Sequence, residues 1–153
     1  MLVVGLLAVE CPARHDGWVI PLRLAARLRD AGLAWKPAPG DRFAIPDRDM
    51  DDEVFVLSNM TIEIHELPEG TIIGFNGTTE WALDDLEKNE AIWLPREDQL
   101  RELLGGTFQR LERTADGYRV LATIGGGVTE FAAETAEEAY GYALLRLVQA
   151  AFS

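Results

Sequence analysis

Apolar residues recur along this chain with two different periods, and the segments of each period occupy separate stretches. Helical spacing, in which an apolar residue returns every third or fourth position, predicts three helices. The first follows Pro21 and ends at Gly32, a residue suited to a left-handed cap. The second lies between Pro95 and Gly105, and the third begins at a capping box, Thr135 to Glu138. We therefore expect helices in the N-terminal, middle and C-terminal parts of the chain.

Segments with strand-like patterns fill the intervals between these helices. Alternation is clearest from Met60 to Glu66, where apolar and polar residues exchange at each position. Short glycine-containing turns at Pro68 to Gly70 and Thr114 to Gly117 predict antiparallel hairpins, and Gly125 to Gly127 is a further turn. A short helical segment is expected from Glu80 to Leu86. The expected strands are Arg42–Ile45, Val54–Leu57, Met60–Glu66, Thr71–Phe75, Ala91–Leu94, Thr107–Arg113, Tyr118–Ile124 and a short one near Val128–Ala132.

The order of these elements indicates an α+β fold, in which a mainly antiparallel sheet packs against N-terminal, middle and C-terminal helices. The chain has 153 residues, of which 48% are hydrophobic, and is long enough to bury one core. We expect a single domain over residues 1–153, with two sheet units, one before Pro95 and one after Gly106. Residues 1–18 are expected to form an N-terminal arm or strand.

The charge balance narrows the classes of partner. Twenty-six acidic and fourteen basic residues give a formal net charge of -12, which repels phosphate backbones and anionic lipid headgroups. We therefore expect no nucleic-acid and no membrane partner, whereas a basic protein or a metal cation is electrostatically easier to bind. The single cysteine, Cys11, excludes an internal disulfide framework and fits a reducing compartment, so we expect a cytoplasmic protein. The sequence does not indicate an oligomeric state.

Alternating acids in the loop 47–53 are the main candidate for a metal site. The candidate ligands are Asp47, Asp49, Asp51 and Glu53. Their carboxylate oxygens suit calcium or magnesium, so a divalent metal is the cofactor to consider. The loop is not an EF-hand, because Asp52 and Ser58 stand where a loop counted from Asp47 needs glycine and glutamate. The simpler interpretation is a solvated acidic turn.

Other polar and aromatic residues give weaker indications of chemistry. His65, with Glu63 on the same strand face, could act as a base or metal ligand, but a lone histidine on a strand is usually plain surface. Cys11 and His15 could pair as nucleophile and base, yet no third residue is identified that would orient them. The turn GFNGTT lacks the spacing of a phosphate-binding loop and is interpreted as structural. The tryptophans could line a ligand groove, although packing is their commoner role; they are Trp18, Trp35, Trp81 and Trp93. We recognise no catalytic constellation, which favours a protein that is not an enzyme.

Three strings of residues carry a resemblance to a known family. They are GDRFAIPDRDMDDEVFVLSNMTIEIHELP, IIGFNGTTEWALDDLE and IWLPREDQLRELLG. From about Pro21 to the C-terminus, the chain resembles a family of small bacterial proteins of uncharacterised activity that are often labelled pilus-assembly proteins. The resemblance implies no particular activity and supplies no catalytic residue. Residues 1–18 lie outside it.

Three functions from different classes agree with these features. The leading hypothesis is a non-enzymatic cytoplasmic protein-binding or adaptor domain, because the chain is acidic and shows no catalytic constellation. The second is an immunity-type or anti-toxin protein that binds a basic partner through complementary charge. The third is a divalent-metal-dependent hydrolase that uses the acidic loop 47–53.

Overall fold

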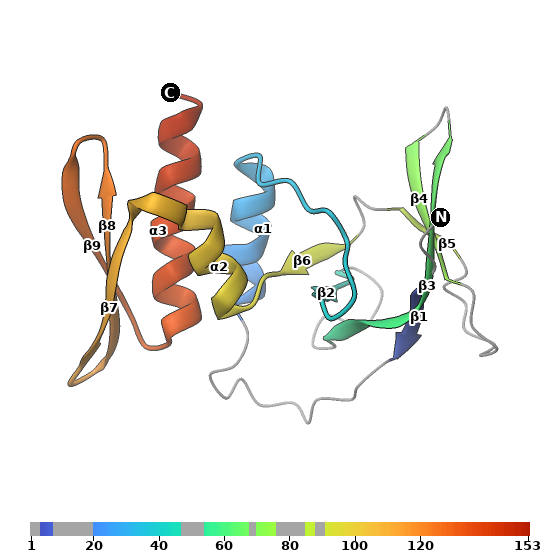
Figure 1. The fold of residues 1–153 in the computed structure, drawn as a ribbon, viewed down its shortest axis with the longest axis horizontal. Helices are drawn as coiled ribbons and strands as arrows, with labels where there is room; N and C mark the ends of the chain where they lie inside the picture. The colour runs from blue at the N-terminus through green and yellow to red at the C-terminus, as the bar shows by residue number, and fades with distance from the viewer. Residues whose placement is uncertain (1–3, 8–19, 47–53, 68–69, 76–84, 88–90) are drawn as a thin grey trace. The chain divides into compact units, whose positions relative to one another are not determined.

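The computed structural model describes residues 4–7, 20–46, 54–67, 70–75, 85–87 and 91–153, and Figure 1 draws the others as a grey trace. The chain divides into two compact units. Unit 1 takes residues 1–13 and 35–93, and unit 2 takes residues 14–34 and 94–153. Unit 2 is thus built from two stretches that are far apart in the sequence.

A largely antiparallel sheet forms the described part of unit 1. Its strand order is β5-β4-β3-β2-β6, and β1 also pairs with β3. β3 runs antiparallel to β1, β2 and β4, and β4 runs antiparallel to β5. The strands are β1 (Val4–Leu7), β2 (Arg42–Ala44), β3 (Phe55–Leu67), β4 (Gly70–Phe75), β5 (Asp85–Glu87) and β6 (Ile92–Leu94), the last of which ends one residue beyond the unit.

The long strand β3 joins two segments that the sequence pattern separates. The pattern predicts one strand before Ser58 and another after Asn59, whereas β3 runs through both residues without a break. Pairing with β1 spans this junction, and such a long-range contact leaves no local signal in the sequence. The second half of β3 pairs with β4, which confirms the predicted antiparallel hairpin.

Aromatic rings form the core of the described part of unit 1. The ring of Trp35 lies 5.8 Å from that of Phe43 and is stacked 6.5 Å from that of Trp93, measured between centroids. Phe43 in turn stacks on Phe55 at 5.5 Å. Separations of about 4.5–7 Å are typical of favourable aromatic pairs. Trp35, Phe43 and Phe55 are all buried.

Unit 2 combines three helices with a three-stranded antiparallel sheet. The sheet is a meander in the order β7-β8-β9. α3 packs against β8 and β9, and both α1 and α2 pack against α3, so α3 lies between the sheet and α1 (Figure 1). The elements are α1 (Leu22–Asp30), α2 (Glu97–Leu104), a short 3-10 turn (Gly105–Thr107), β7 (Phe108–Thr114), β8 (Gly117–Ile124), β9 (Gly127–Ala133) and α3 (Ala136–Ala151).

The ends of these helices are set by local chemistry. After α1, the chain turns at Gly32, whose φ of 105° is left-handed, and the N–H of Leu33 donates to the carbonyl oxygen of Leu28 at 3.0 Å. Gly105 ends α2 with a φ of 53°. At the start of α3, the Thr135 hydroxyl accepts a hydrogen bond from a backbone N–H of the first turn. The predicted caps at Gly32 and Gly105 are therefore confirmed, and so is the Thr135 half of the capping box predicted from Thr135 to Glu138.

α1 and α3 approach each other closely at Gly141. A Cβ atom added to Gly141 would lie 2.7 Å from Cδ2 of Leu24 and 2.9 Å from Cδ1 of Ile20. Those distances are shorter than an ordinary carbon–carbon contact of about 3.5–4.0 Å. Only a residue without a side chain fits this crossing, which explains a glycine in the middle of a helix.

Several local predictions are wrong. The helical segment expected from Glu80 to Leu86 ends in residues that belong to β5, where Leu86 pairs with Ile73 of β4. Helical spacing places Leu103 with Leu100 and Leu104 on the apolar face of α2 and predicts its burial, yet it is 39% exposed. The same spacing predicts that α3 buries Leu147 and Val148, which are only half-buried. In each case the tertiary partner decides burial, and spacing alone does not reveal it.

The fold class is confirmed as α+β with mainly antiparallel sheet and N-terminal, middle and C-terminal helices. The two expected sheets are present, one before Pro95 and one after Gly106. Within the described residues, none of the helices combines the length and apolar character needed to cross a membrane.

Candidate functional site

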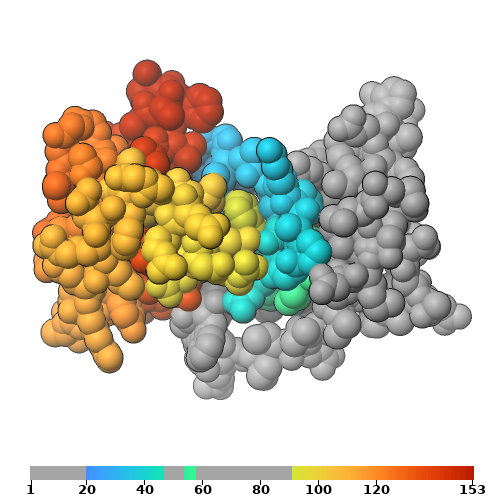
Figure 2. Space-filling view, in the orientation of Figure 1, coloured from blue at the N-terminus to red at the C-terminus, as the bar shows by residue number. Residues whose placement is uncertain are grey.

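The face of the sheet β7-β8-β9 that points away from α3 is the most distinctive polar surface in the described residues; we call it the outer face. Val120, Ala122 and Ile124 of β8 are buried on the side of α3. Because side chains alternate along a strand, Arg119 and its partners point to the other side. The space-filling view shows the atoms of these strands, in orange, at the surface (Figure 2).

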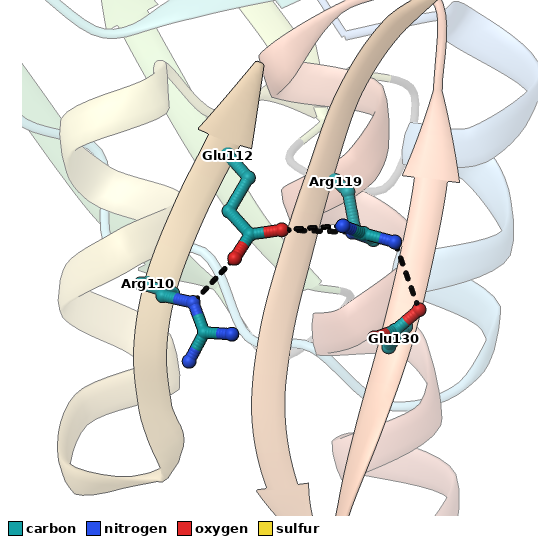
Figure 3. A network of polar contacts seen from close by, with 4 residues as sticks. All are labelled: Arg110, Glu112, Arg119 and Glu130. Atoms are coloured by element: carbon teal, nitrogen blue, oxygen red, sulfur yellow. Dashed lines mark hydrogen bonds and ion pairs between the residues drawn. The ribbon is translucent and has the colours of Figure 1, made fainter. Parts of the chain in front are cut away.

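Four charged side chains form a ladder across the outer face: Arg110, Glu112, Arg119 and Glu130 (Figure 3). Glu112 lies directly opposite Arg119 in the register of β7 and β8. Two nitrogens of Arg119 donate to Oε2 of Glu112, at 2.6 and 3.0 Å, and a third donates to Oε2 of Glu130 at 3.3 Å. On the other side, Nε of Arg110 donates to Oε1 of Glu112 at 2.5 Å. The ladder thus joins all three strands.

The charges of the ladder shift one another's proton affinities. Hydrogen bonds from Arg110, and then from Arg119, lower the pKa of Glu112 below its ordinary value. The carboxylate of Glu112 in turn raises the pKa of Arg119. All of these side chains remain in contact with water, so their pairing contributes little to stability. Its main effect is to hold positive and negative groups in a fixed pattern on an open surface.

The edge strand β9 carries the last member of the ladder, Glu130. β7 and β9 are the two edges of the sheet. In β9 the four residues Gly127–Glu130 are all exposed, and the side chain of Val128 is 62% exposed. Within the described residues, β9 pairs with β8 alone, so the backbone groups along its other side have no strand partner. An unprotected edge of this kind can accept a further strand.

A second polar group, in unit 1, has a structural role. Asp41 is buried, and its Oδ2 accepts hydrogen bonds from Nε1 of Trp35 at 2.9 Å and from the N–H of Ala38 at 3.0 Å. The N–H of Asp41 also donates to the carbonyl oxygen of Ala38, and its own carbonyl oxygen accepts from the N–H of Leu57. The carboxylate therefore fastens the proline-rich connection to the aromatic core. Nε1 of Trp93 is buried and has no hydrogen-bond partner among the described residues.

The structure gives only a partial answer on the tryptophans. Trp35 and Trp93 come together by stacking, and Trp35 is buried in the core of unit 1, not lining an open groove. Trp18 and Trp81 lie outside the described residues.

Most candidate residues for catalysis or metal binding also lie outside the described part of the chain. The proposed metal ligands Asp47, Asp49, Asp51 and Glu53 do so, and so do Cys11 and His15. The backbones of Glu63 and His65 lie in β3, opposite Gly74 and Ile72 of β4. No group of three or more His, Cys, Asp or Glu residues that could hold a metal occurs among the described residues. The divalent-metal site therefore stays a prediction.

Of the two glycine-rich turns considered in the sequence, one lies largely outside the described residues and the other can be compared with its prediction. Only Gly74 and Phe75 of the turn GFNGTT are described, and both belong to β4. Gly125 and Gly126, with φ angles of 66° and 84°, connect β8 to β9. The prediction of a hairpin turn at Gly125 to Gly127 is confirmed.

The ladder is the feature that the sequence interpretation missed. A signal was present: the predicted turn from Thr114 to Gly117 fixes the register of the hairpin and places Glu112 opposite Arg119. The contact between Arg119 and Glu130 depends on the third strand, whose first and last residues the sequence indicates only approximately.

Comparisons with known proteins give no relative: no protein-family model, no curated protein and no solved structure matches the chain. The resemblance to small bacterial proteins labelled pilus-assembly proteins therefore stays a prediction.

Proposed function

We propose that this protein is a non-enzymatic protein-binding or adaptor domain of the cytoplasm, and that the outer face of the sheet β7-β8-β9 is the surface that meets its partner. The observation that carries the proposal is the charge ladder of Arg110, Glu112, Arg119 and Glu130 on an open sheet face. A fixed pattern of opposite charges selects partners with the complementary pattern and speeds their encounter, even where it adds little stability to the fold.

A charge-swapped variant tests this role without changing the net charge. The substitutions are Arg110→Glu, Glu112→Arg, Arg119→Glu and Glu130→Arg. Each ion pair then keeps a partner of opposite sign, so the sheet retains its ladder while the pattern offered to a partner is inverted. The matched control exchanges another exposed ion pair, Arg29 with Asp30 on α1, by Arg29→Asp and Asp30→Arg.

Affinity capture from an extract of the producing cells compares these variants with the unmodified protein. We expect a protein that is captured by the unmodified chain and by the α1 control, and is lost with the swapped ladder. Circular dichroism spectra and melting curves of all three proteins check that the fold is kept. Capture that is equal for all three, or no reproducible capture at all, would overturn the proposal.

The net charge of -12 supports a second candidate, an immunity-type or anti-toxin protein that binds a basic partner. Long-range attraction between an acidic and a basic protein raises the rate of association and is weakened by salt. A gene for a basic toxin beside the gene for this protein is the expected finding. Its absence in the genomes that carry the gene would dispose of this candidate.

A further inference from the structure

The two edges of the sheet β7-β8-β9 differ in how they are guarded against an added strand. β7 contains a bulge between Phe108 and Arg110. It also carries three charged residues, which are Arg110, Glu112 and Arg113. Bulges and charged side chains are common devices that prevent strands from adding to an edge. β9, of sequence GVTEFAA, has a regular register with β8, contains no proline and carries only one charge, Glu130. Among the described strands of this sheet, the open edge is therefore that of β9.

Charge argues against a second copy of the chain as the added strand. Glu130 is the middle residue of β9. If two β9 strands paired antiparallel about their centres, each Glu130 would face its own copy, and like charges directly opposite each other are destabilising. Each chain also carries a net charge of -12. An occupant of positive charge is favoured on both grounds.

The carboxylate of Glu130 is available to such an occupant. Its side chain is 56% exposed, and within the described part of the chain its contact is made by Oε2 alone, at 3.3 Å from Arg119. Two residues away on the same face, Val128 exposes an apolar side chain. The edge thus presents an acid and an apolar group on one face, two positions apart.

We infer that the edge of β9 binds an extended segment of a partner protein, which adds a fourth strand to the sheet. The inference rests on the proposed protein-binding function and deepens it. The segment carries an arginine or lysine opposite Glu130 and an apolar residue two positions away, opposite Val128. Its backbone supplies hydrogen bonds to β9, and these two side chains supply specificity, as in other cases of strand addition.

Synthetic peptides with blocked ends provide the probe. The first has arginine at the centre, valine two positions to either side and threonine at the remaining four positions. The second replaces the arginine with glutamate, and the third replaces both valines and the two threonines beside the arginine with proline, so that N–H groups facing β9 are lost whichever way the added strand runs. Amide hydrogen exchange of the full chain, measured by NMR at increasing peptide concentration, locates the bound segment and gives the affinity.

We expect the arginine peptide to protect the amides of β9 and to leave those of β7 unchanged. A directly opposed ion pair contributes up to about 1 kcal/mol, so the glutamate peptide should bind about three- to fivefold more weakly. The proline peptide should not bind, because proline has no N–H group to donate to the backbone of β9. Glu130→Lys should reverse the preference between the first two peptides, whereas Glu134→Lys, at an exposed acid just beyond β9, should preserve it.

Four results would overturn the inference: no binding of the arginine peptide, protection at β7 instead of β9, equal binding of the arginine and glutamate peptides, or a concentration-dependent dimer through β9 of the unmodified chain. The peptide experiment is independent of the capture experiment. If the peptides fail while the swapped ladder still abolishes capture, the outer face binds the partner without strand addition, and only the present inference is wrong. If the swapped ladder leaves capture unchanged, the proposed function is wrong whatever the peptides show.

Discussion

Replacing Gly141 with alanine tests the close approach of α1 and α3, because two opposite effects meet at this position. Alanine is favoured over glycine in the interior of a helix by about 1 kcal/mol. Against this, the added Cβ would lie 2.7 Å from Leu24 and 2.9 Å from Ile20. Both residues are almost completely buried, at 2% and 1% exposure, so neither has free space to enter.

The magnitudes decide the sign. To restore an ordinary contact, each of the two side-chain ends must retreat by roughly 1 Å. Adding a methyl group to a filled core costs about 1–3 kcal/mol. After subtracting the gain in helix propensity, we expect Gly141→Ala to destabilise the protein by about 1 kcal/mol.

Making the same substitution in a Leu24→Ala variant tests whether the effect of Gly141→Ala on stability changes sign. Leu24→Ala removes the leucine end nearest Gly141 and by itself costs about 2–5 kcal/mol. In that background the added methyl group fills vacated space, so Gly141→Ala should stabilise by up to about 1 kcal/mol. The coupling between the two sites is then about 2 kcal/mol, within the range for residues in contact.

Urea unfolding gives the free energy of unfolding of the unmodified protein, the two single variants and the double variant. Far-UV circular dichroism is the signal to follow, because α1, α2 and α3 all belong to unit 2 and the helical signal therefore reports on the unit that contains Gly141. The propensity contribution is measured separately by comparing Arg146→Gly with Arg146→Ala, at an exposed position of the same helix. The reasoning is refuted if Gly141→Ala raises the stability of the unmodified protein, or if its effect has the same sign in both backgrounds.

Four further outcomes are expected. Asp41→Ala removes the acceptor of two N–H groups, of which Nε1–H of Trp35 is buried and the N–H of Ala38 is partly buried, and should cost about 1–3 kcal/mol in urea unfolding followed by tryptophan fluorescence; an effect under about 0.5 kcal/mol would contradict a structural role for this carboxylate. Gly117→Ala places a Cβ 2.2 Å from a carbonyl oxygen at the end of β9 and should cost about 2–4 kcal/mol, with faster amide exchange in β9 as the readout. Thr135→Ala removes the N-cap of α3 and should cost about 0.5–2 kcal/mol in thermal melts, with Thr135→Ser largely preserving stability. Because the pKa of Glu112 is lowered in the folded state, its contribution is present above the unfolded pKa and is lost as the pH falls through the folded pKa; Arg110→Gln should raise that pKa in an NMR titration, and an unchanged value would show that the pair does not form in solution.

The sequence predicts best those features whose causes are local. Caps at Gly32, Gly105 and Thr135 depend on residues within one or two helical turns, so their chemistry is visible in the chain itself. Hairpins are predicted for the same reason, since a short turn fixes both the direction and the register of its strands. These local signals are sufficient for the α+β class and for two sheets.

Features that depend on distant partners could not be predicted in the same way. Asp85 and Leu86 are the last residues of the helical segment expected from Glu80, yet they pair with β4 as part of β5. The same distinction applies to the candidate site. The pairing of Glu112 with Arg119 can be predicted from one hairpin turn, whereas the contact of Arg119 with Glu130 depends on the position of the neighbouring strand β9. The edge of β9 is exposed because no further strand of this sheet lies beside it among the described residues, and the sequence of β9 itself does not encode the position of other strands.

The placement of α1 has a consequence for synthesis of the protein on the ribosome. α1 packs against α3, and about 100 residues of chain separate the two helices. At about 5–20 residues per second, α1 emerges on the order of 5–20 s before its partner exists. During that interval the apolar stripe of Leu24, Ala25 and Leu28 has no α3 to cover it, so the nascent chain offers a chaperone a binding segment that the finished protein hides.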